Sequence, residues 1–101
     1  MIGLFHLLTV SAFLFAVGIY AVLAKKNAIL MLIGIEFMIN AGVLNLVAFG
    51  RYDRAFYGGQ TFALFAIVLA AAAVAVALAI ILNVYKHYKS IDPDDVTDLR
   101  D

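Results

Sequence analysis

Glu36 is the residue whose type and position in this chain most clearly indicate chemistry. It is the single glutamate of the sequence and stands in the apolar run MLIGIEFMIN. Asn40 follows one helical turn later, so in a helix its amide projects from the same face. An acid inside a membrane span is costly and rare, and such residues commonly belong to proton relays. Glu36, with Asn40 beside it, is therefore a candidate proton-relay group.

A purely structural role for Glu36 is the competing interpretation. A protonated glutamate can hydrogen-bond a neighbouring helix, a contact worth about 0.6 kcal/mol in a membrane. Placing an acidic residue near the centre of a transmembrane helix costs about 2.5–3.5 kcal/mol. The contact does not offset that cost, which favours proton transfer for Glu36; an amide such as Asn40 is more often used in helix packing. Without cysteine, and without a pattern typical of a metal site or of a nucleophile with its base, the sequence assigns no catalytic and no metal-binding residue.

The elements that position Glu36 are expected to be transmembrane helices. Of the 101 residues, 66% are hydrophobic and 14% are charged, against about 25% charged residues in soluble domains. So small a chain cannot bury that many apolar side chains within itself, and the surplus must face the lipid bilayer. The net charge is zero and no basic block is present, which argues against nucleic acid as a partner.

Three apolar stretches are long enough to cross a hydrocarbon core, which needs about 20 residues of helix. We expect one all-α membrane domain over residues 1–101, with helices at about 2–23, 28–50 and 60–85 and a tail at 86–101. Asn27 is placed to cap the second helix. In that helix Glu36 is about 12 Å from the start, well inside the hydrocarbon.

Lysine and arginine near the span ends predict the orientation. Lysines flank one side of the membrane, at Lys25, Lys26, Lys86 and Lys89, and two arginines flank the other, at Arg51 and Arg54. The positive-inside rule then places the first loop and the C-terminus in the cytoplasm and the N-terminus outside.

Small residues in the third span indicate close packing against another helix. Ala66, Ala70, Ala73 and Ala77 fall at helical spacing, and such a stripe lets a second backbone approach closely, either in this chain or in another subunit. Three short helices make a layer too thin to enclose a small-molecule pocket of about 300–1,000 Å³. The chain is therefore expected to be one piece of a larger membrane assembly.

The tail is expected to begin a short helical turn. Asp92 would cap it, Pro93 would be its first residue, and acidic residues would follow in its positive first turn. Val96 and Leu99 would then share a face that can dock on a partner; a frayed tail is the alternative.

The stretch KKNAILMLIGIEFMINAGVLNLVAFG resembles the K subunit family of the proton-pumping NADH:quinone oxidoreductases, the small three-span subunit of respiratory complex I. A basic pair and an asparagine precede an apolar run with the pattern Gly-x-Glu-x-Met-x-Asn-Ala. The resemblance covers almost the whole chain, including the Gly59-Gln60 pair before the third span and the tail DDVTDLRD. It implies a place in the membrane arm, in the inner (cytoplasmic) membrane, between quinone-proximal and antiporter-like subunits.

The resemblance also implies roles for individual residues. In the family, the glutamate that matches Glu36 belongs to a chain of buried polar groups that carries protons between subunits and couples quinone reduction to pumping. The basic pair, here Lys25 and Lys26, lies on the cytoplasmic loop and affects coupling. The chain is then a non-catalytic subunit of a translocase. NADH, flavin, Fe–S clusters and quinone are expected on other subunits, and no cofactor is expected in this chain.

The third span departs from the family pattern Ala-Ala-Ala-Glu-x-Ala-x-Gly-Leu-Ala. The matching run is AAAAVAVALA, so Ala73 stands where the family has a second buried glutamate. A carboxylate of a neighbouring subunit or ordered water can fill the gap, Glu36 can carry the path alone, or this member pumps weakly. The first account is favoured because alanine leaves space, although water there needs polar groups supplied by partners.

Two other functions stay open. The chain can be a structural helix layer between larger subunits, with Glu36 as a packing acid. It can also be the small subunit of a multisubunit sodium/proton antiporter, which has three spans and is separated only by the Gly-x-Glu-x-Met-x-Asn-Ala run. Small multidrug exporters typically have four spans and carry their acid in the first, which argues against that class.

Overall fold

The protein is all-α, in agreement with the expected fold class. A computed structural model describes residues 2–52 and 58–95 of the chain. Its elements are α1 at Leu4–Ala24, α2 at Ala28–Tyr52, α3 at Gly59–Tyr88 and a short 3₁₀ helix, η1, at Pro93–Asp95. The three α-helices are each long and apolar enough to cross a membrane, which confirms the three expected spans.

The end of α3 lies three residues beyond the expected position at residue 85. Lys86 and His87 stand in the last turn, where positive charge suits the negative end of the helix dipole. Lys89 then ends the helix in the left-handed conformation, with φ 58°, and its N–H donates to the carbonyl oxygen of Tyr85. The first residues of the expected tail are therefore helical.

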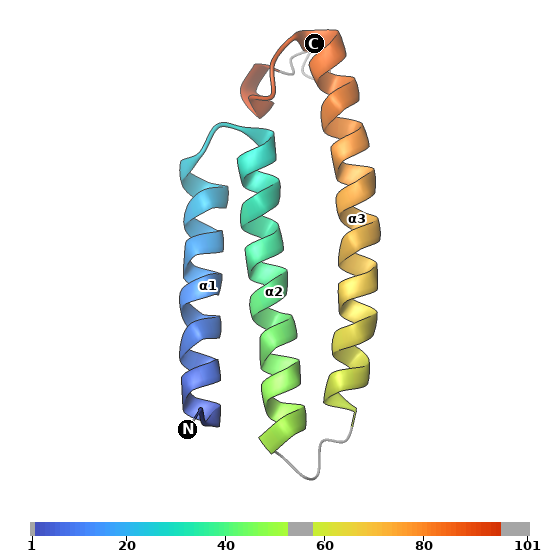
Figure 1. Cartoon of the computed structure of the whole chain (residues 1–101). Coiled ribbons are helices and arrows are strands. Elements are labelled where there is room, and N and C mark those ends of the chain that lie inside the picture. The colour runs from blue at the N-terminus through green and yellow to red at the C-terminus, as the bar shows by residue number, and fades with distance from the viewer. Residues whose placement is uncertain (1, 53–57, 96–101) are drawn as a thin grey trace.

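The three helices stand side by side and antiparallel, with α2 in the middle (Figure 1). α1 packs along one side of α2 and α3 along the other. Few side chains are fully buried in so thin a bundle, and its outer faces carry large apolar groups such as Phe13 and Leu69, which are 70% and 69% exposed. Surfaces of this kind are suited to lipid or to other membrane subunits.

Small residues bring α1 and α2 into close contact. A Cβ added at Gly18 would lie 2.5 Å from the carbonyl oxygen of Gly34, and one added at Gly34 would lie 2.7 Å from that of Gly18. The other buried residues on this contact are Ser11, Ala41 and Ala48. On both helices the buried positions recur every seven residues, the spacing of helices that pack nearly antiparallel at a shallow crossing angle.

The contact between α2 and α3 is close at one end and open at the other. A Cβ added at Gly50 would lie 3.0 Å from the Cα of Gly59, and Ala63 in the next turn is buried. Toward the opposite end, an apolar hollow of about 280 Å³ separates the two helices, with Ile35 on one wall and Ile80 on the other.

The alanine stripe of α3 packs mainly within the chain. Ala66, Ala70 and Ala77 are half-buried, and α2 is the helix that packs beside them. Ala73, by contrast, is exposed, and Val74 is the half-buried residue at this level. The stripe predicted from spacing is therefore confirmed at three of its four positions as a contact inside the chain.

At the end of the bundle where α1 joins α2, hydrogen bonds satisfy the first backbone N–H groups of α2. As expected, Asn27 caps α2: its Oδ1 accepts hydrogen bonds from the N–H groups of Ile29 at 2.9 Å and Leu30 at 3.2 Å. The segment after α3 folds back to the same place, where the Ala28 N–H donates to the Ile91 carbonyl oxygen at 2.8 Å. The first N–H groups of α2 are thus bonded both by the residue that precedes the helix and by the segment that follows α3.

The turn expected in the tail is present as η1. The Asp94 N–H donates to Asp92 Oδ1 at 2.9 Å, so Asp92 caps the turn and Pro93 is its first residue, as predicted. Val96 and Leu99, for which a docking face is predicted, lie outside the described residues, as does Arg54.

Candidate functional site

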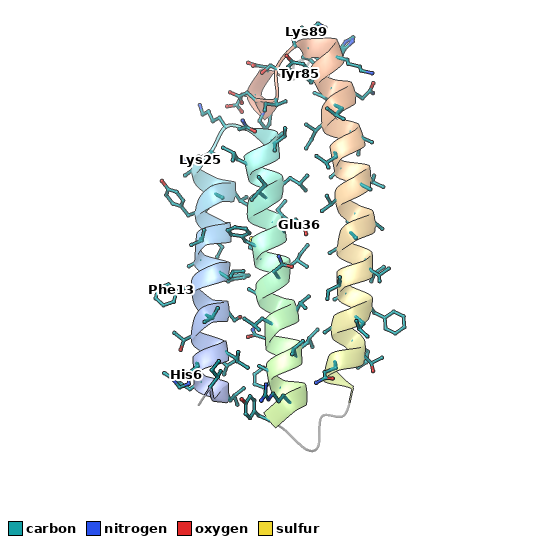
Figure 2. All side chains as sticks on the ribbon, viewed as in Figure 1. His6, Phe13, Lys25, Glu36, Tyr85 and Lys89 are labelled. Carbon is teal, nitrogen blue, oxygen red and sulfur yellow. The ribbon has the colours of Figure 1, made fainter. Side chains whose placement is uncertain are left out.

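Glu36 lies deep within α2. It is eight residues after the first residue of the helix and sixteen before the last, so it is about 12 Å and about 24 Å from the two ends. Figure 2 shows its side chain on the α3 side of α2. The residue is half-buried. Within residues 2–52 and 58–95, its carboxyl group forms neither a hydrogen bond nor an ion pair.

The glycine of the Gly-x-Glu pattern determines which way Glu36 points. Gly34 is pressed against Gly18 of α1 with no space for a methyl group. Two residues along an α-helix correspond to a rotation of about 200°, because one turn contains 3.6 residues. Glu36 therefore projects away from α1. The close glycine contact fixes the rotation of α2 about its axis and with it the direction of the carboxyl group.

Asn40 extends the polar face by one turn. It is four residues after Glu36, so the two side chains lie one above the other on the same face. Asn40 is exposed. No hydrogen bond of its side chain is formed with the described part of the chain. Glu36 and Asn40 together make a short polar strip on an otherwise apolar helix surface, and neither side chain has a hydrogen-bond partner among the described residues.

Lys25 and Lys26 lie at the end of the bundle and not beside Glu36. The Lys25 ammonium nitrogen is 5.7 Å from the centroid of the Tyr20 ring, a cation–π geometry. The Lys26 Nζ is 3.6 Å from Asp94 Oδ2, and both side chains are largely exposed. Lys25 thus lies against the end of α1 and Lys26 pairs with the C-terminal segment, both near the start of α2, which is about 12 Å along the helix axis from Glu36.

Ala73 is placed on the open side of the contact between α2 and α3. It is seven residues before Ile80, two helical turns, so both lie on one face of α3. Ile80 lines the apolar hollow, whereas Glu36 does not. The side chains around this hollow are apolar, so the described part of the chain offers no side-chain group there that can hold a water in place of an acid.

Ser11 is a polar residue to which sequence reasoning gives no role. It is 3% exposed, and its Oγ donates to the Ala41 carbonyl oxygen of the facing helix at 2.9 Å. A serine in an apolar span usually bonds the backbone of its own helix, so the sequence carries no signal for a bond between helices. The seven-residue spacing from Ser11 to Gly18 is the one feature that places both on the same seam.

Comparison with known proteins gives a consistent result. Residues 6–101 match the model of the family described as NADH-ubiquinone/plastoquinone oxidoreductase chain 4L. NADH-quinone oxidoreductase subunit K of Chlorobaculum parvum is 44% identical over 100 residues, which cover 99% of this chain and 94% of that protein. NADH-quinone oxidoreductase subunit 11 of Thermus thermophilus is 47% identical over 97 residues, which cover 94% of this chain and 97% of that protein. NAD(P)H-quinone oxidoreductase subunit 4L of a Synechococcus species is 43% identical over 101 residues, 99% of each chain.

Proposed function

Because the chain belongs to the NADH-ubiquinone/plastoquinone oxidoreductase chain 4L family, we propose that it contributes Glu36 to a buried proton path that couples quinone reduction to proton pumping. Membership makes the chain a membrane subunit of a multisubunit NADH-quinone oxidoreductase, and other subunits of that complex are its partners. The proton path is our inference from the surroundings of Glu36.

The observation that carries this proposal is a carboxyl group inside a membrane span that has no bonding partner among residues 2–52 and 58–95. Inserting an acid at such a depth costs about 2.5–3.5 kcal/mol. A packing role inside the chain would have the Glu36 carboxyl group bond α1 or α3, yet it forms no hydrogen bond with any described residue. A purely structural role would therefore need a neighbouring subunit. An unbonded carboxyl group that points away from the α1 seam is free to exchange a proton with groups outside the chain.

The path is proposed to leave the chain through the strip formed by Glu36 and Asn40. The exposed amide of Asn40 can hydrogen-bond a water that also reaches the carboxyl group one turn away. No second acid stands in α3, because Ala73 occupies the position at which the family resemblance places one. The next proton carrier is therefore supplied by a neighbouring subunit, with or without ordered water between them.

The remaining assignments follow the family. We place the chain between antiporter-like and quinone-proximal subunits of the membrane arm, with the Lys25–Lys26 loop in the cytoplasm and the N-terminus outside. NADH, flavin, Fe–S clusters and quinone are assigned to other subunits, and this chain takes no part in the redox steps. The loop lysines are proposed to affect coupling from the end of α2 and not by direct proton transfer.

The test is Glu36→Gln in the assembled complex, with Glu36→Asp as the matched control that keeps an acid at the position. Glutamine keeps the size and the hydrogen-bonding capacity of the side chain but cannot release a proton. We expect Glu36→Gln to assemble and to lose proton pumping together with coupled electron transfer, and Glu36→Asp to retain part of both. Pumping is measured by quenching of a pH-sensitive dye in sealed vesicles supplied with NADH.

A structural helix layer predicts a different outcome. If Glu36 only packs against a neighbouring subunit, glutamine would satisfy the same hydrogen bonds and pumping would stay at the wild-type level in the assembled complex. That result would end the relay assignment while leaving family membership untouched.

A further inference from the structure

A second polar residue within the span lies on the face of α2 opposite to Glu36. Asn45 is nine residues after Glu36, which is two and a half helical turns, so the two side chains project in opposite directions. Asn45 is half-buried on the α1 side, between the buried Ala41 and Ala48. Its Oδ1 is covered and has no hydrogen-bond partner among the described residues. A buried acceptor without a donor is unfavourable, above all in a bilayer, where no bulk water can replace the donor.

Asn45 lines a hollow between α1 and α2 with a volume of about 370 Å³. Its lining includes the buried Ser11 and Ala41 and two small exposed residues, Ala12 from α1 and Gly42 from α2, so the hollow opens on the surface of the bundle. Phe15, which is 44% exposed, stands on its rim. One water occupies about 30 Å³ in the liquid, so the hollow is much larger than a single water and has room for side chains of another helix.

Packing against the described residues does not require a glycine at position 42. A Cβ added there would meet no atom within 4 Å, whereas one added at Gly18 or Gly34 would collide with the facing backbone. Glycine is also among the poorest helix formers, so an unneeded glycine weakens α2. No described residue uses the space above Gly42, so a group of another subunit can occupy it.

We propose that this hollow receives a transmembrane helix of a neighbouring subunit, which donates a hydrogen bond from a Ser, Thr, Asn or Gln side chain to the Asn45 carboxamide. Helices associate in membranes through small residues that allow close approach and through polar side chains that bond across the contact. The Asn45 carboxamide can turn about its terminal torsion to meet the donor. A lipid acyl chain would fill the space but would leave the acceptor unpaired. A water held between Asn45 and Ser11, which also lines the hollow, is the other alternative, and the experiment below distinguishes it.

The contact is independent of the proton path. It requires only that the chain is a subunit of a complex with other membrane helices, which family membership provides. Glu36 lies on the other face of α2, so Glu36→Gln is expected to leave the contact unchanged. Failure of the relay and failure of this contact are therefore separate results.

The experiment uses a diazirine analogue of leucine at position 8 in the purified, assembled complex. Leu8 lines the hollow, and the analogue has nearly the shape of leucine, so the hollow is not blocked. On illumination the carbene inserts into whatever lies beside it, and mass spectrometry identifies the product. We expect a covalent product with a transmembrane segment of another subunit; adducts with lipid or water alone would overturn the proposal.

Two substitutions complete the test. Gly42→Phe places a large side chain in the hollow from a position where an added Cβ meets no described atom within 4 Å. We expect at least a tenfold loss of the cross-linked product; an unchanged yield would mean that the neighbour does not enter the hollow. Asn45→Leu keeps the volume and removes the hydrogen bond. We expect it to lower the temperature at which the complex releases the chain, because the neighbour's donor is left unpaired. An equal or higher release temperature would refute the hydrogen bond.

Discussion

Substituting Gly18 by alanine is expected to separate α1 from α2 and to weaken the retention of the chain in its complex. The new Cβ would lie 2.5 Å from the Gly34 carbonyl oxygen, whereas ordinary contacts begin near 3.4 Å. The obstructing atom belongs to the backbone, so the helices themselves must move apart, by about 0.9 Å if they move directly away from each other. A gap of that size forfeits about a quarter to a half of the van der Waals attraction along the seam.

Overpacking of this kind costs about 1–3 kcal/mol. That range corresponds to a change of roughly 5- to 150-fold in the equilibrium between packed and separated arrangements of α1 and α2. We expect a chain with separated helices to be released from the complex more readily. Because Gly34 fixes the rotation of α2, the same shift also displaces Glu36, and we expect the assembled fraction to pump less per turnover. Retention is measured by solubilising the complex over a detergent series and quantifying the chain that stays bound.

Gly3→Ala is the matched control on the same helix. A Cβ added at Gly3 would be 3.8 Å from the nearest atom, His6 Nδ1, an ordinary contact. Gly3 precedes α1 in an extended conformation that alanine also adopts, with φ −107°. If Gly18→Ala and Gly3→Ala release the chain at the same detergent concentration, the glycine seam does not hold α1 to α2 and the reasoning is refuted.

Three further changes test other parts of the structure. Asn27→Ala removes the cap of α2 and is expected to cost about 1 kcal/mol, seen as a lower release temperature; no change would mean that partners supply the cap. Asp94→Asn removes the exposed ion pair with Lys26 and is expected to leave stability and electron transfer within experimental error, so a large loss in either would show that the pair is buried in the complex. Ala73→Glu is expected to assemble, because Ala73 is exposed and faces open space; a complex without the chain would contradict this placement.

The helices and caps followed from the sequence because local rules determine them. Length and apolar composition are sufficient to locate three spans, and a single side chain such as Asn27 or Asp92 is sufficient to start a helix or turn. The main difference between the expected and observed helices is the end of α3, which reaches Tyr88. Polar residues end an apolar membrane span, but the helix itself can continue through them. Membrane spans and helices are bounded by different physical effects.

The helix faces were harder to predict because nearly every position of the spans is apolar. Without a polar side, a transmembrane helix gives no sign of which residues meet a neighbouring helix, and only spacing remains. Spacing correctly placed three alanines of α3, Ala66, Ala70 and Ala77, on the face that packs against α2. It wrongly added Ala73, because Val74 is the half-buried residue at that level. It also left Ser11 without a role, because its partner is a backbone carbonyl, which every residue possesses.

For the candidate site, the sequence identified the residue types and the structure added their directions. The pattern Gly-x-Glu-x-Met-x-Asn-Ala singled out Glu36 and Asn40, and their common face followed from helical spacing. The pattern alone does not show that Glu36 points away from α1. That direction depends on Gly18, which is sixteen residues before Gly34 in the sequence and in contact with it in space.

The most direct test of the proton path is whether Glu36 changes its protonation during turnover. Redox-induced infrared difference spectra of the purified complex report carboxyl groups that gain or lose protons, through the C=O stretch of the protonated form. The account predicts a carboxyl band in the wild-type spectrum that is absent from the spectrum of an assembled Glu36→Gln complex. Identical spectra in the carboxyl region for the two complexes would contradict it.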